Sequence, residues 1–434
     1  MIEPFSVAHS RNAPSKLLIL AQNDLTSRIQ EFFNPVIRNF IMEKLKVGII
    51  GVGNMGSCHA SCLKQVPSVR LTALCDINPE AFKRVPEDVR QGVSCHVSAE
   101  DFFAKADVDL VMIAVPHYSH PDMAIMAMDH GKHFILEKPI CVHKAEAERL
   151  IRECAKHPEL VKSAMFNQRT IKLHVRLKEL IESGQFGRIN RVNWIITDWF
   201  RTQAYYDSGD WRASWRGEGG GVLLNQCPHN LDLFQWFFGL PKKVSAQVHF
   251  GKFHDIEVED EVNAYLEYED GMTGNFITTT GEYPGTNRLE IAAEMGRIVM
   301  EGGKIAFRRN VKPCSQFCHD ALRAWDVLDC WDCVIPCAEE PAVPTQHMRI
   351  VANVVDAIRN GAKLIAPVEE GIRGLELGNA MLLSGWTGAP VELPIDSADY
   401  AARLQKLVET SRYTKKPVTA TAASSEGFAN SFGH

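Results

Sequence analysis

The sequence of 434 residues lacks the features that mark several classes of protein. It has no apolar run near the roughly 20 residues that a membrane-spanning helix needs. The formal net charge is −6, so the excess of positive charge that nucleic-acid or anionic-membrane binding needs is missing. No secretory signal is recognisable, because Glu3 comes early and the apolar stretch at 17–20 is too short for a signal core. We therefore expect a cytoplasmic protein with no nucleic-acid partner and no membrane partner.

Cysteine is not scarce, but a disulfide pattern is absent. The twelve cysteines are scattered, and in a reducing compartment we expect free thiols. Within residues 310–342 a cysteine-rich stretch holds the C-x-x-C pair Cys330 and Cys333, which leaves two interpretations open. One is a structural metal site, and the other is an inserted lid or interface segment. A structural metal site would need a second C-x-x-C pair to complete its ligands, and the sequence has none. We therefore favour the inserted segment and expect no metal.

The chain has enough apolar residues, 45%, to form a core, and its length suggests two domains. From residue 45 onward, continuous apolar runs alternate with helical patterns. This alternation indicates βαβ units and a doubly wound parallel sheet. The expected strands are 45–52, 69–76, 108–116, 132–139 and 160–169, and the expected helices are 55–65, 120–131 and 144–157.

After about residue 185 the strands become longer and richer in aromatic and β-branched residues, which predicts a mostly antiparallel sheet. The expected strands are 188–200, 243–250, 260–270 and 273–281, and helices return at 346–361 and 372–386. The fold class is thus α/β followed by α+β. We divide the chain into an N-terminal extension (1–41), a dinucleotide-binding domain (42–168), a substrate and oligomerisation domain (169–412) and a disordered tail (413–434).

The first strand runs into a G-x-G-x-x-G motif formed by Gly51, Gly53 and Gly56. In a strand–turn–helix context these glycines allow a tight turn, close approach of a pyrophosphate, and close packing of the helix. Asp76 follows at the end of the second strand, where a carboxylate accepts hydrogen bonds from the adenosine ribose. It would repel a 2′-phosphate, and the next four residues contain no arginine, so NAD is favoured over NADP.

Glu137 and Lys138 close the strand 132–139, at the edge of a parallel sheet where ligands bind. A lysine there would lie near the nicotinamide, whose positive charge in oxidised NAD would lower the lysine pKa. Such a group suits proton exchange with a substrate hydroxyl. The alternative is a surface Glu-Lys-Pro turn.

The stretch 219–239 places Asn225, Cys227, His229 and Asp232 behind three glycines. A zinc site would need about four ligands and a cysteine nucleophile would need an adjacent base, but Cys227 and His229 diverge on a helix. Asn225 and His229 are four apart and would share one helix face, and Asp232 could fix the tautomer of the imidazole. A buried histidine in a packed helix is the other interpretation.

In order and spacing, the motifs G-V-G-N-M-G, A-V-P-H-Y-S-H and E-K-P resemble those of the glucose–fructose oxidoreductase / inositol dehydrogenase / rhizopine-catabolism (Gfo/Idh/MocA) family. The stretch 219–239 resembles its second-domain active-site helix, so the resemblance covers about residues 45–405. It implies a Rossmann domain followed by an open, mostly antiparallel sheet, with the active site between them. It also implies a homo-oligomer, dimer or tetramer, in which a partner covers the open sheet.

The resemblance also implies roles for individual residues. Lys138 and His229 match the family's catalytic lysine and histidine. Asn225 stands where many polyol-oxidising members have Asp, and an amide cannot act as a base. The implied cofactor-binding residues are Gly51, Gly53, Asn54, Met55, Gly56, Asp76, Pro116, His117, His120, Glu137 and Lys138.

Aromatic and arginine side chains lead into that stretch and suit a sugar pocket, because flat rings pack on pyranose C–H faces and Arg donates to hydroxyls. The candidates are Trp211, Arg212 and Trp215, with Arg169 from the strand 160–169, besides Asn225 and His229. The alternatives are core or interface contacts for the tryptophans and a surface ion pair for Arg169.

These features predict an NAD-dependent oxidoreductase of a secondary hydroxyl on a sugar or glycoside. Because Asn225 replaces Asp, the chain resembles a branch that acts on glycosides and anhydrosugars, often at C3 of the pyranose. One alternative is redox-neutral glycoside cleavage, elimination or isomerisation with retained NAD. Another is a non-catalytic sensor of sugar or NAD.

Overall fold

The computed structural model describes residues 43–209 and 211–413. The predicted extension at 1–41 and nearly all of the predicted tail at 413–434 lie outside these residues. From Leu45 onward, the described residues belong to one compact unit that contains two sheets.

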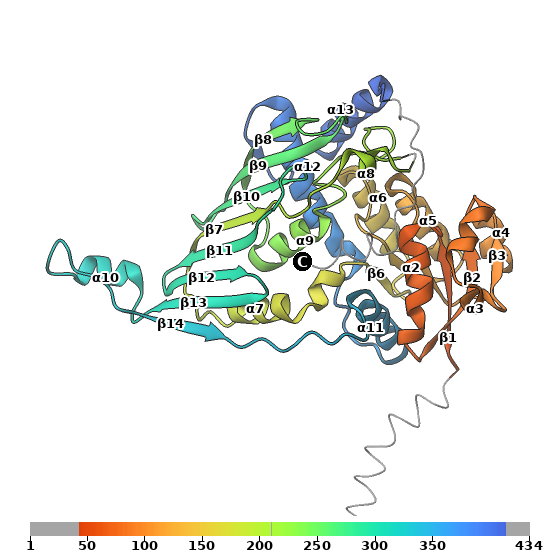
Figure 1. Ribbon diagram of the computed structural model, residues 1–434, viewed down its shortest axis with the longest axis horizontal. Coiled ribbons are helices and arrows are strands. Elements are labelled where there is room, and N and C mark those ends of the chain that lie inside the picture. Colours follow the sequence, from red (N-terminus) through yellow and green to blue (C-terminus); the bar gives the residue numbers. More distant parts are fainter. Residues whose placement is uncertain (1–42, 210, 414–434) are drawn as a thin grey trace, which may run out of the picture. The chain divides into compact units, whose positions relative to one another are not determined.

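The first sheet, sheet A, has six parallel strands in the order β3-β2-β1-β4-β5-β6 (Figure 1). Its strand order reverses between β1 and β4, and the carboxyl ends of the strands meet there, which is where doubly wound sheets bind ligands. Side chains of β1 such as Val47 and Ile49 are fully buried, as the continuous apolar run predicted. The strands are β1 (Leu45–Ile50), β2 (Val69–Cys75), β3 (Ser94–His96), β4 (Leu110–Ile113), β5 (His133–Leu136) and β6 (Lys162–Ala164).

Helices connect the strands of sheet A, and the longer ones bury one face against it. In α6, for example, Ala147 and Leu150 are buried while charged residues occupy the outer face. The α-helices of this part are α2 (Asn54–Cys62), α3 (Glu87–Arg90), α4 (Ala99–Lys105), α5 (His120–Asp129) and α6 (Lys144–Cys154). Short 3-10 helices lie at η1 (Leu63–Gln65), η2 (Pro79–Arg84), η3 (His117–Ser119) and η4 (Asn167–Thr170).

The second sheet, sheet B, has nine strands in the order β14-β13-β12-β11-β7-β10-β9-β8-β15. All neighbours pair antiparallel except β7 and β10, which pair in parallel. The strands are β7 (Ile189–Ile196), β8 (Lys243–Phe250), β9 (Glu259–Glu267), β10 (Thr273–Thr279), β11 (Asn287–Ala293), β12 (Gly296–Glu301), β13 (Lys304–Asn310), β14 (Cys330–Ile335) and β15 (Val391–Glu392).

One face of sheet B is covered by α9 (Pro228–Phe238), whose Phe234 ring contacts Trp194 of β7 and Phe276 of β10. Against α9 packs α12 (Gly371–Thr387). A side chain at Gly374 would lie only 3.0 Å from the Asp232 backbone nitrogen, so glycine sets this spacing. The remaining elements are α7 (Lys172–Glu182), α8 (Gln203–Asp207), α10 (Cys314–Asp320), α11 (Gln346–Asn360), η5 (Val368–Glu370) and α13 (Ser397–Thr410).

The C-terminal part of the chain returns to sheet A and joins it to α12. The backbone N–H of Ala164 and the hydroxyl of Ser163, both in β6, donate to the carbonyl of Ala366 at 2.9 and 2.8 Å. The buried Lys144 ammonium of α6 lies 2.7 Å from the Glu376 carboxylate of α12. These contacts join sheet A to the segment before α12 and to α12 itself.

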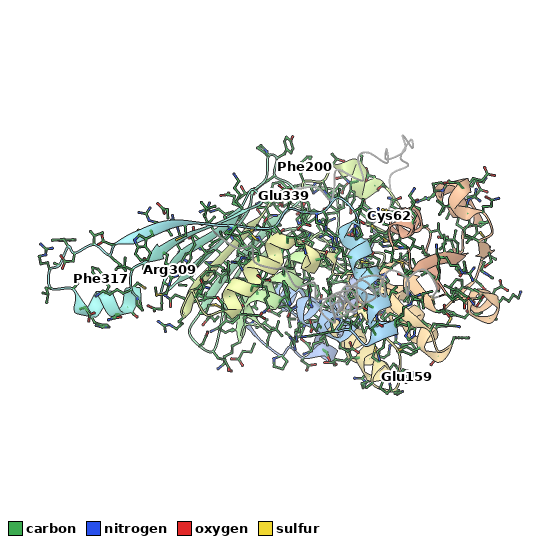
Figure 2. All side chains as sticks on the ribbon, turned by 90° about the horizontal axis from the view of Figure 1, so that it is seen from below. Cys62, Glu159, Phe200, Arg309, Phe317 and Glu339 are labelled. Carbon is green, nitrogen blue, oxygen red and sulfur yellow. The ribbon has the colours of Figure 1, made fainter. Side chains whose placement is uncertain are left out.

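The cysteine-rich stretch lies at the outer end of sheet B. Strand β14 pairs with β13, and α10 precedes it, with Phe317 and Arg309 labelled there in Figure 2. Part of the predicted insertion is thus a regular edge strand. Among the described residues, no group of three or more His, Cys, Asp or Glu side chains could hold a metal, and no helix could cross a membrane.

Candidate active site

The glycine turn between β1 and α2 has the geometry of a phosphate-binding turn. Gly51 has φ +88°, and a Cβ there would lie 2.4 Å from the Ala114 carbonyl oxygen. At Gly56 a Cβ would lie 1.8 Å from the Gly51 carbonyl oxygen, so the helix starts against the strand. At Gly53 the space around a Cβ is open. This leaves the N-terminus of α2, with Asn54 and Met55, accessible to a bound phosphate.

Asp76 lies beside this turn, at the end of β2. Its carboxylate accepts hydrogen bonds from the backbone N–H groups of Val52, at 2.7 Å, and Asn78, at 2.8 Å. Each oxygen keeps a further lone pair that could accept from a ribose hydroxyl. Arg84, which the sequence analysis did not consider, donates to the Asn54 side chain at 3.1 Å.

Glu137 and Lys138 leave the end of β5 toward the same edge, and the Lys138–Pro139 peptide bond is cis. The Glu137 carboxylate lies 2.7 Å from the His59 ring of α2 and accepts from the Lys138 backbone N–H. Burial alone would raise the Glu137 pKa, but the hydrogen bond and charge of His59, with His347 and Lys138, lower it to about 2. Glu137 is therefore ionised, and its hydrogen bonds link the Lys138 loop to α2.

The Lys138 side chain reaches across to the second sheet, where its Nζ donates to the Asn225 carbonyl at 3.0 Å. Burial lowers its pKa, and although Glu137 opposes this, the charges of Arg212 and Arg201 lower it further. The lysine pKa is thus lowered by the protein itself, before any cofactor charge is added. The surface-turn alternative does not describe this half-buried side chain.

The loop after β4 carries Pro116, His117 and His120, all predicted to bind the cofactor. The His120 ring lies between two backbone carbonyls, Pro139 at 2.6 Å and Val115 at 2.8 Å, and is buried. His120 therefore links the loop after β4 to the Lys138 loop, and neither of its ring nitrogens is free to contact a ligand. His117 is buried against the edge of the Trp211 ring, 5.0 Å between centroids, and burial lowers its pKa well below the usual range.

The stretch 219–239 departs from the predicted single helix. α9 begins only at Pro228, so Asn225 lies in a turn before it and does not share a helix face with His229. The buried Glu259 carboxylate accepts from the backbone N–H groups of Gly221, at 2.8 Å, and Leu223, at 3.1 Å, and so holds this turn. The prediction that Asn225 and His229 share a helix face was wrong, because Glu259, which holds the turn, is distant in sequence.

The glycines at 219–221 lie where segments of the protein come close together. A Cβ at Gly219 would lie 2.3 Å from the Val142 side chain, and one at Gly221 would lie 2.0 Å from the Glu259 carbonyl oxygen. Gly219 has φ +83° as well. These glycines allow close approach of protein segments, so no contact with substrate or cofactor is needed to account for them.

His229, in the first turn of α9, is buried, and its Nδ1 has no hydrogen-bond partner among the described residues. Burial lowers the pKa of its imidazole well below the usual range, and the nearby Lys138 charge lowers it further. The ring is therefore neutral, and its Nδ1 is an enclosed polar atom that no described residue satisfies.

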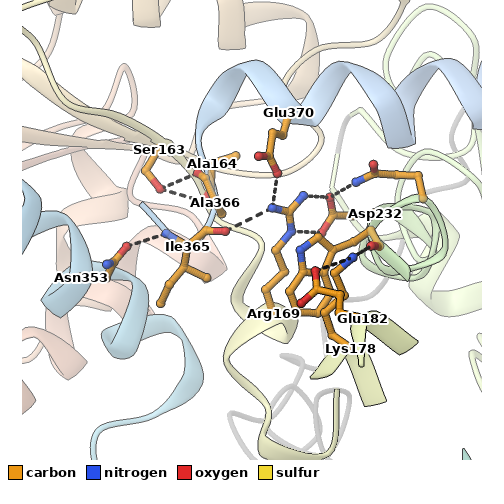
Figure 3. A network of polar contacts seen from close by, with 12 residues as sticks. Ser163, Ala164, Arg169, Lys178, Glu182, Asp232, Asn353, Ile365, Ala366 and Glu370 are labelled. Carbon is orange, nitrogen blue, oxygen red and sulfur yellow. Dashed lines mark hydrogen bonds and ion pairs between the residues drawn. The ribbon is translucent and has the colours of Figure 1, made fainter. Parts of the chain in front are cut away.

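Asp232 does not orient His229, contrary to the prediction. It forms a bidentate ion pair with Arg169, at 2.8 Å from Nε and 2.6 Å from Nη2 (Figure 3). The other terminal nitrogen of Arg169 donates to Glu370 at 2.5 Å and to the Ile365 carbonyl at 3.1 Å. Arg169 is thus a buried tie between η4, α9 and η5. It is not available for substrate, which corrects its predicted role.

The residues predicted to form a sugar pocket fall into two groups, one near the site and one in the core. The Arg212 guanidinium lies between the rings of Tyr205 and Trp211, at 4.5 and 4.4 Å, and its buried Nε and Nη1 have no partner among the described residues. Trp215, in contrast, is buried against Trp386 and Phe250, so it is a core residue and not a substrate contact.

Cys227 does not fit the alternative of a cysteine nucleophile. Cys227 is fully buried, with its sulfur 3.0 Å from the Thr278 hydroxyl, and burial raises its pKa to about 12, so it is no nucleophile. One residue of the site, Glu218, was not predicted. Glu218 and Tyr205 both accept from the Asn225 side-chain amide, and the only signal of Glu218 in the sequence is its position directly before the three glycines.

Two family models match the chain. One is described as an oxidoreductase family with an NAD-binding Rossmann fold and matches residues 45–164. The other is the GFO/IDH/MocA C-terminal domain and matches residues 174–299, so the two together span more than half of the chain. The chain belongs to the Gfo/Idh/MocA oxidoreductase family. This confirms the predicted family, the two-part fold and an NAD-dependent dehydrogenase.

Named relatives and solved structures agree with this membership. The chain is 25% identical over 263 residues to myo-inositol 2-dehydrogenase of Thermotoga maritima, covering 58% of this chain and 74% of the relative. It is 25% identical over 292 residues to levoglucosan dehydrogenase of Pseudarthrobacter phenanthrenivorans, covering 59% and 74%. The WlbA dehydrogenase of Chromobacterium violaceum, solved with NADH and UDP-GlcNAcA, is similar with a TM-score of 0.69 and 27% identity, covering 82% and 98%.

The residues of sheet A fit the NAD that this family uses. The open space at Gly53 and the first turn of α2 suit the pyrophosphate, and Asp76 suits the adenosine ribose. Lys138 and the loop after β4 lie at the edge where the nicotinamide would be expected.

Proposed function

We propose that this oxidoreductase oxidises the C3 hydroxyl of a sugar or glycoside to a ketone and catalyses the reverse reduction. The supporting observation is the bond between Lys138, at the end of a sheet A strand, and the Asn225 carbonyl before α9, with the unpaired nitrogen of His229 nearby in sequence. The sugar class rests on the relatives, which are named for inositol and levoglucosan. The C3 position rests on the resemblance noted for the Asn225 branch.

In this reaction the protein moves a proton and holds the substrate. Lys138, in its neutral form, accepts the proton of the reacting hydroxyl, and burial favours that form. Neutral His229 and the Asn225 amide hydrogen-bond the same part of the substrate. When bound, NAD supplies the hydride acceptor. Trp211 and Arg212, whose side chains stack on each other, would contact the sugar or the cofactor.

A panel of sugars tests this function. Wild-type protein with NAD is incubated with myo-inositol, levoglucosan and methyl glucopyranosides, and NADH absorbance is followed. We expect one NADH per substrate oxidised and a keto product identified by NMR. With the best pyranoside, the 3-deoxy analogue should be inert, whereas the 2-deoxy and 4-deoxy analogues should still react. Reaction of the 3-deoxy analogue would refute C3, and product without net NADH would favour the redox-neutral alternative.

The proposal includes a homo-oligomer, dimer or tetramer. Sheet B buries one face under α9, while β9 presents alternate side chains such as Asn263 and the 42%-exposed Tyr265 on its other face. A partner covering that face would bury the Tyr265 ring. Light scattering at several protein concentrations decides between monomer, dimer and tetramer.

A further inference from the structure

The position that distinguishes this chain from many polyol-oxidising relatives, Asn225, lies directly against a carboxylate. Its Nδ2 donates to Oε1 of Glu218 and, at 3.2 Å, to the Tyr205 hydroxyl. Glu218 is fully buried, and its other oxygen, Oε2, accepts from the Ala213 backbone N–H at 2.7 Å. The carboxylate that many polyol-oxidising members of the family carry at this position is thus replaced here by an amide, which donates to the neighbouring carboxylate of Glu218.

This contact fixes which way the Asn225 amide points. A carboxylate oxygen only accepts hydrogen bonds, so the atom of Asn225 that faces Glu218 has to be the nitrogen. The amide oxygen, Oδ1, must then point the other way. It accepts no hydrogen bond from a described residue and is not among the enclosed atoms, so it is accessible to a ligand.

The backbone of Asn225 adds a second constraint, because its carbonyl accepts from the Lys138 ammonium. One residue thus contacts the proton-accepting lysine through its main chain and Glu218 through its side chain. A substrate hydroxyl that lies beside Lys138 would meet Oδ1 as a hydrogen-bond acceptor.

We propose that Glu218 is a positioning residue that orients the Asn225 amide, so that Oδ1 accepts the hydrogen bond of the substrate hydroxyl next to Lys138. This inference rests on the proposed function of the site. It explains why asparagine is needed at 225. With Glu218 in place, an aspartate would put two carboxylates in contact, and such a pair retains a shared proton.

The inference predicts the behaviour of three variants. In Glu218→Gln, the new amide keeps its oxygen on the Ala213 N–H and turns its nitrogen toward residue 225. Asn225 must then flip and present a donor to the substrate. Asn225→Asp creates the carboxylate contact. In the double variant Glu218→Gln/Asn225→Asp, the introduced glutamine accepts from Ala213 through its oxygen and donates to the introduced carboxylate through its nitrogen, so the polar atoms of the pair match again.

Steady-state kinetics with the best substrate of the sugar panel and thermal unfolding without ligand test this. We expect kcat to fall about 10- to 100-fold in each single variant, the range of one hydrogen bond to a charged group. The double variant should recover to within about tenfold of wild type, because its polar groups again match. The midpoint of unfolding should show the same recovery. Glu179→Gln, on the exposed face of α7, is the matched control and should match wild type.

The outcomes separate this inference from the proposed function. Wild-type kcat in Glu218→Gln, or a double variant with no more activity than the worse single variant, would overturn the positioning role. If the wild type oxidises no sugar, the proposed function fails. The unfolding midpoints then still decide whether the two positions are coupled: additive changes in the midpoint refute the contact, and recovery in the double variant supports it.

Discussion

Lys138 experiences opposing influences, and their balance sets the pH at which it can accept a proton. Burial and the charges of Arg212 and Arg201 lower its pKa, whereas the adjacent Glu137 carboxylate raises it, and the net direction is downward. The amine is needed in its neutral form for oxidation. The fraction of neutral amine increases as the pH rises through this lowered pKa.

We expect kcat/KM for oxidation to rise with pH and to level off below the ordinary lysine pKa of about 10.4, whereas reduction should show the opposite slope.

Lys138→Met should lower kcat about 10²- to 10⁴-fold, the usual contribution of a proton-transfer group, and leave NAD binding within a few-fold. NADH formation and NAD titration by fluorescence are the measurements. Lys242→Met, at an exposed site, is the control, and a Lys138→Met enzyme with normal turnover would contradict the assignment.

Individual residues of the site could be predicted only where their position follows from the neighbouring sequence. The glycines, Asp76 and Lys138 follow strands directly, so their placement at one sheet edge follows from the alternating pattern. Arg169 looked equally suitable, but its partner Asp232 is 63 positions away and the ion pair is invisible in the sequence. Glu218 is close to Asn225 in sequence, but the turn that brings the two side chains together was not predicted.

At the scale of elements, the helix and strand types were mostly predictable, and their ends were not. The expected strand 108–116 ends at Ile113, although the Ala114 N–H still donates to the Ile50 carbonyl at 2.8 Å, and the loop of the site follows. α9 starts several residues late because Glu259 holds the preceding turn. Functional loops begin where side chains from elsewhere replace the regular hydrogen bonds, and local patterns carry no signal of that.

The crossing of α9 and α12 offers a test at this scale. Because a Cβ at Gly374 would already lie 3.0 Å from the Asp232 nitrogen and 3.2 Å from its Cα, Gly374→Val must push the two helices apart. We expect a loss of about 1–3 kcal/mol in the free energy of unfolding, measured by urea denaturation, together with lower kcat because α9 carries His229. Arg373→Ala, exposed on α12, should change neither. Wild-type stability of Gly374→Val would show that the crossing is tolerant.

At the scale of the whole molecule, cofactor binding should couple to global stability. NAD at 100 times its Kd would stabilise the folded chain by about 2.7 kcal/mol, provided that it binds only the folded state. The open space around Gly53 means that a larger side chain there need not disturb the apo protein. The same side chain would occupy the volume that the pyrophosphate needs.

Gly53→Val should therefore unfold at the same temperature as wild type without NAD and lose the rise that NAD produces. Differential scanning fluorimetry with and without NAD measures both quantities. Cys95→Val, at an exposed position on β3, is the control and should keep the full rise. A full NAD-dependent rise in Gly53→Val would show that the pyrophosphate does not pass over this turn.

The hydrogen bonds that join β6 to Ala366 have a consequence for synthesis. Ser163 and its carbonyl partner are 203 residues apart, so the edge of sheet A emerges from the ribosome long before the segment that completes it. At synthesis rates of about 5–20 residues per second, this interval lasts about 10–40 s. Throughout it, the nascent chain presents an uncapped strand edge, which is a template for unwanted pairing. The enzyme is thus most exposed to aggregation while it is being made.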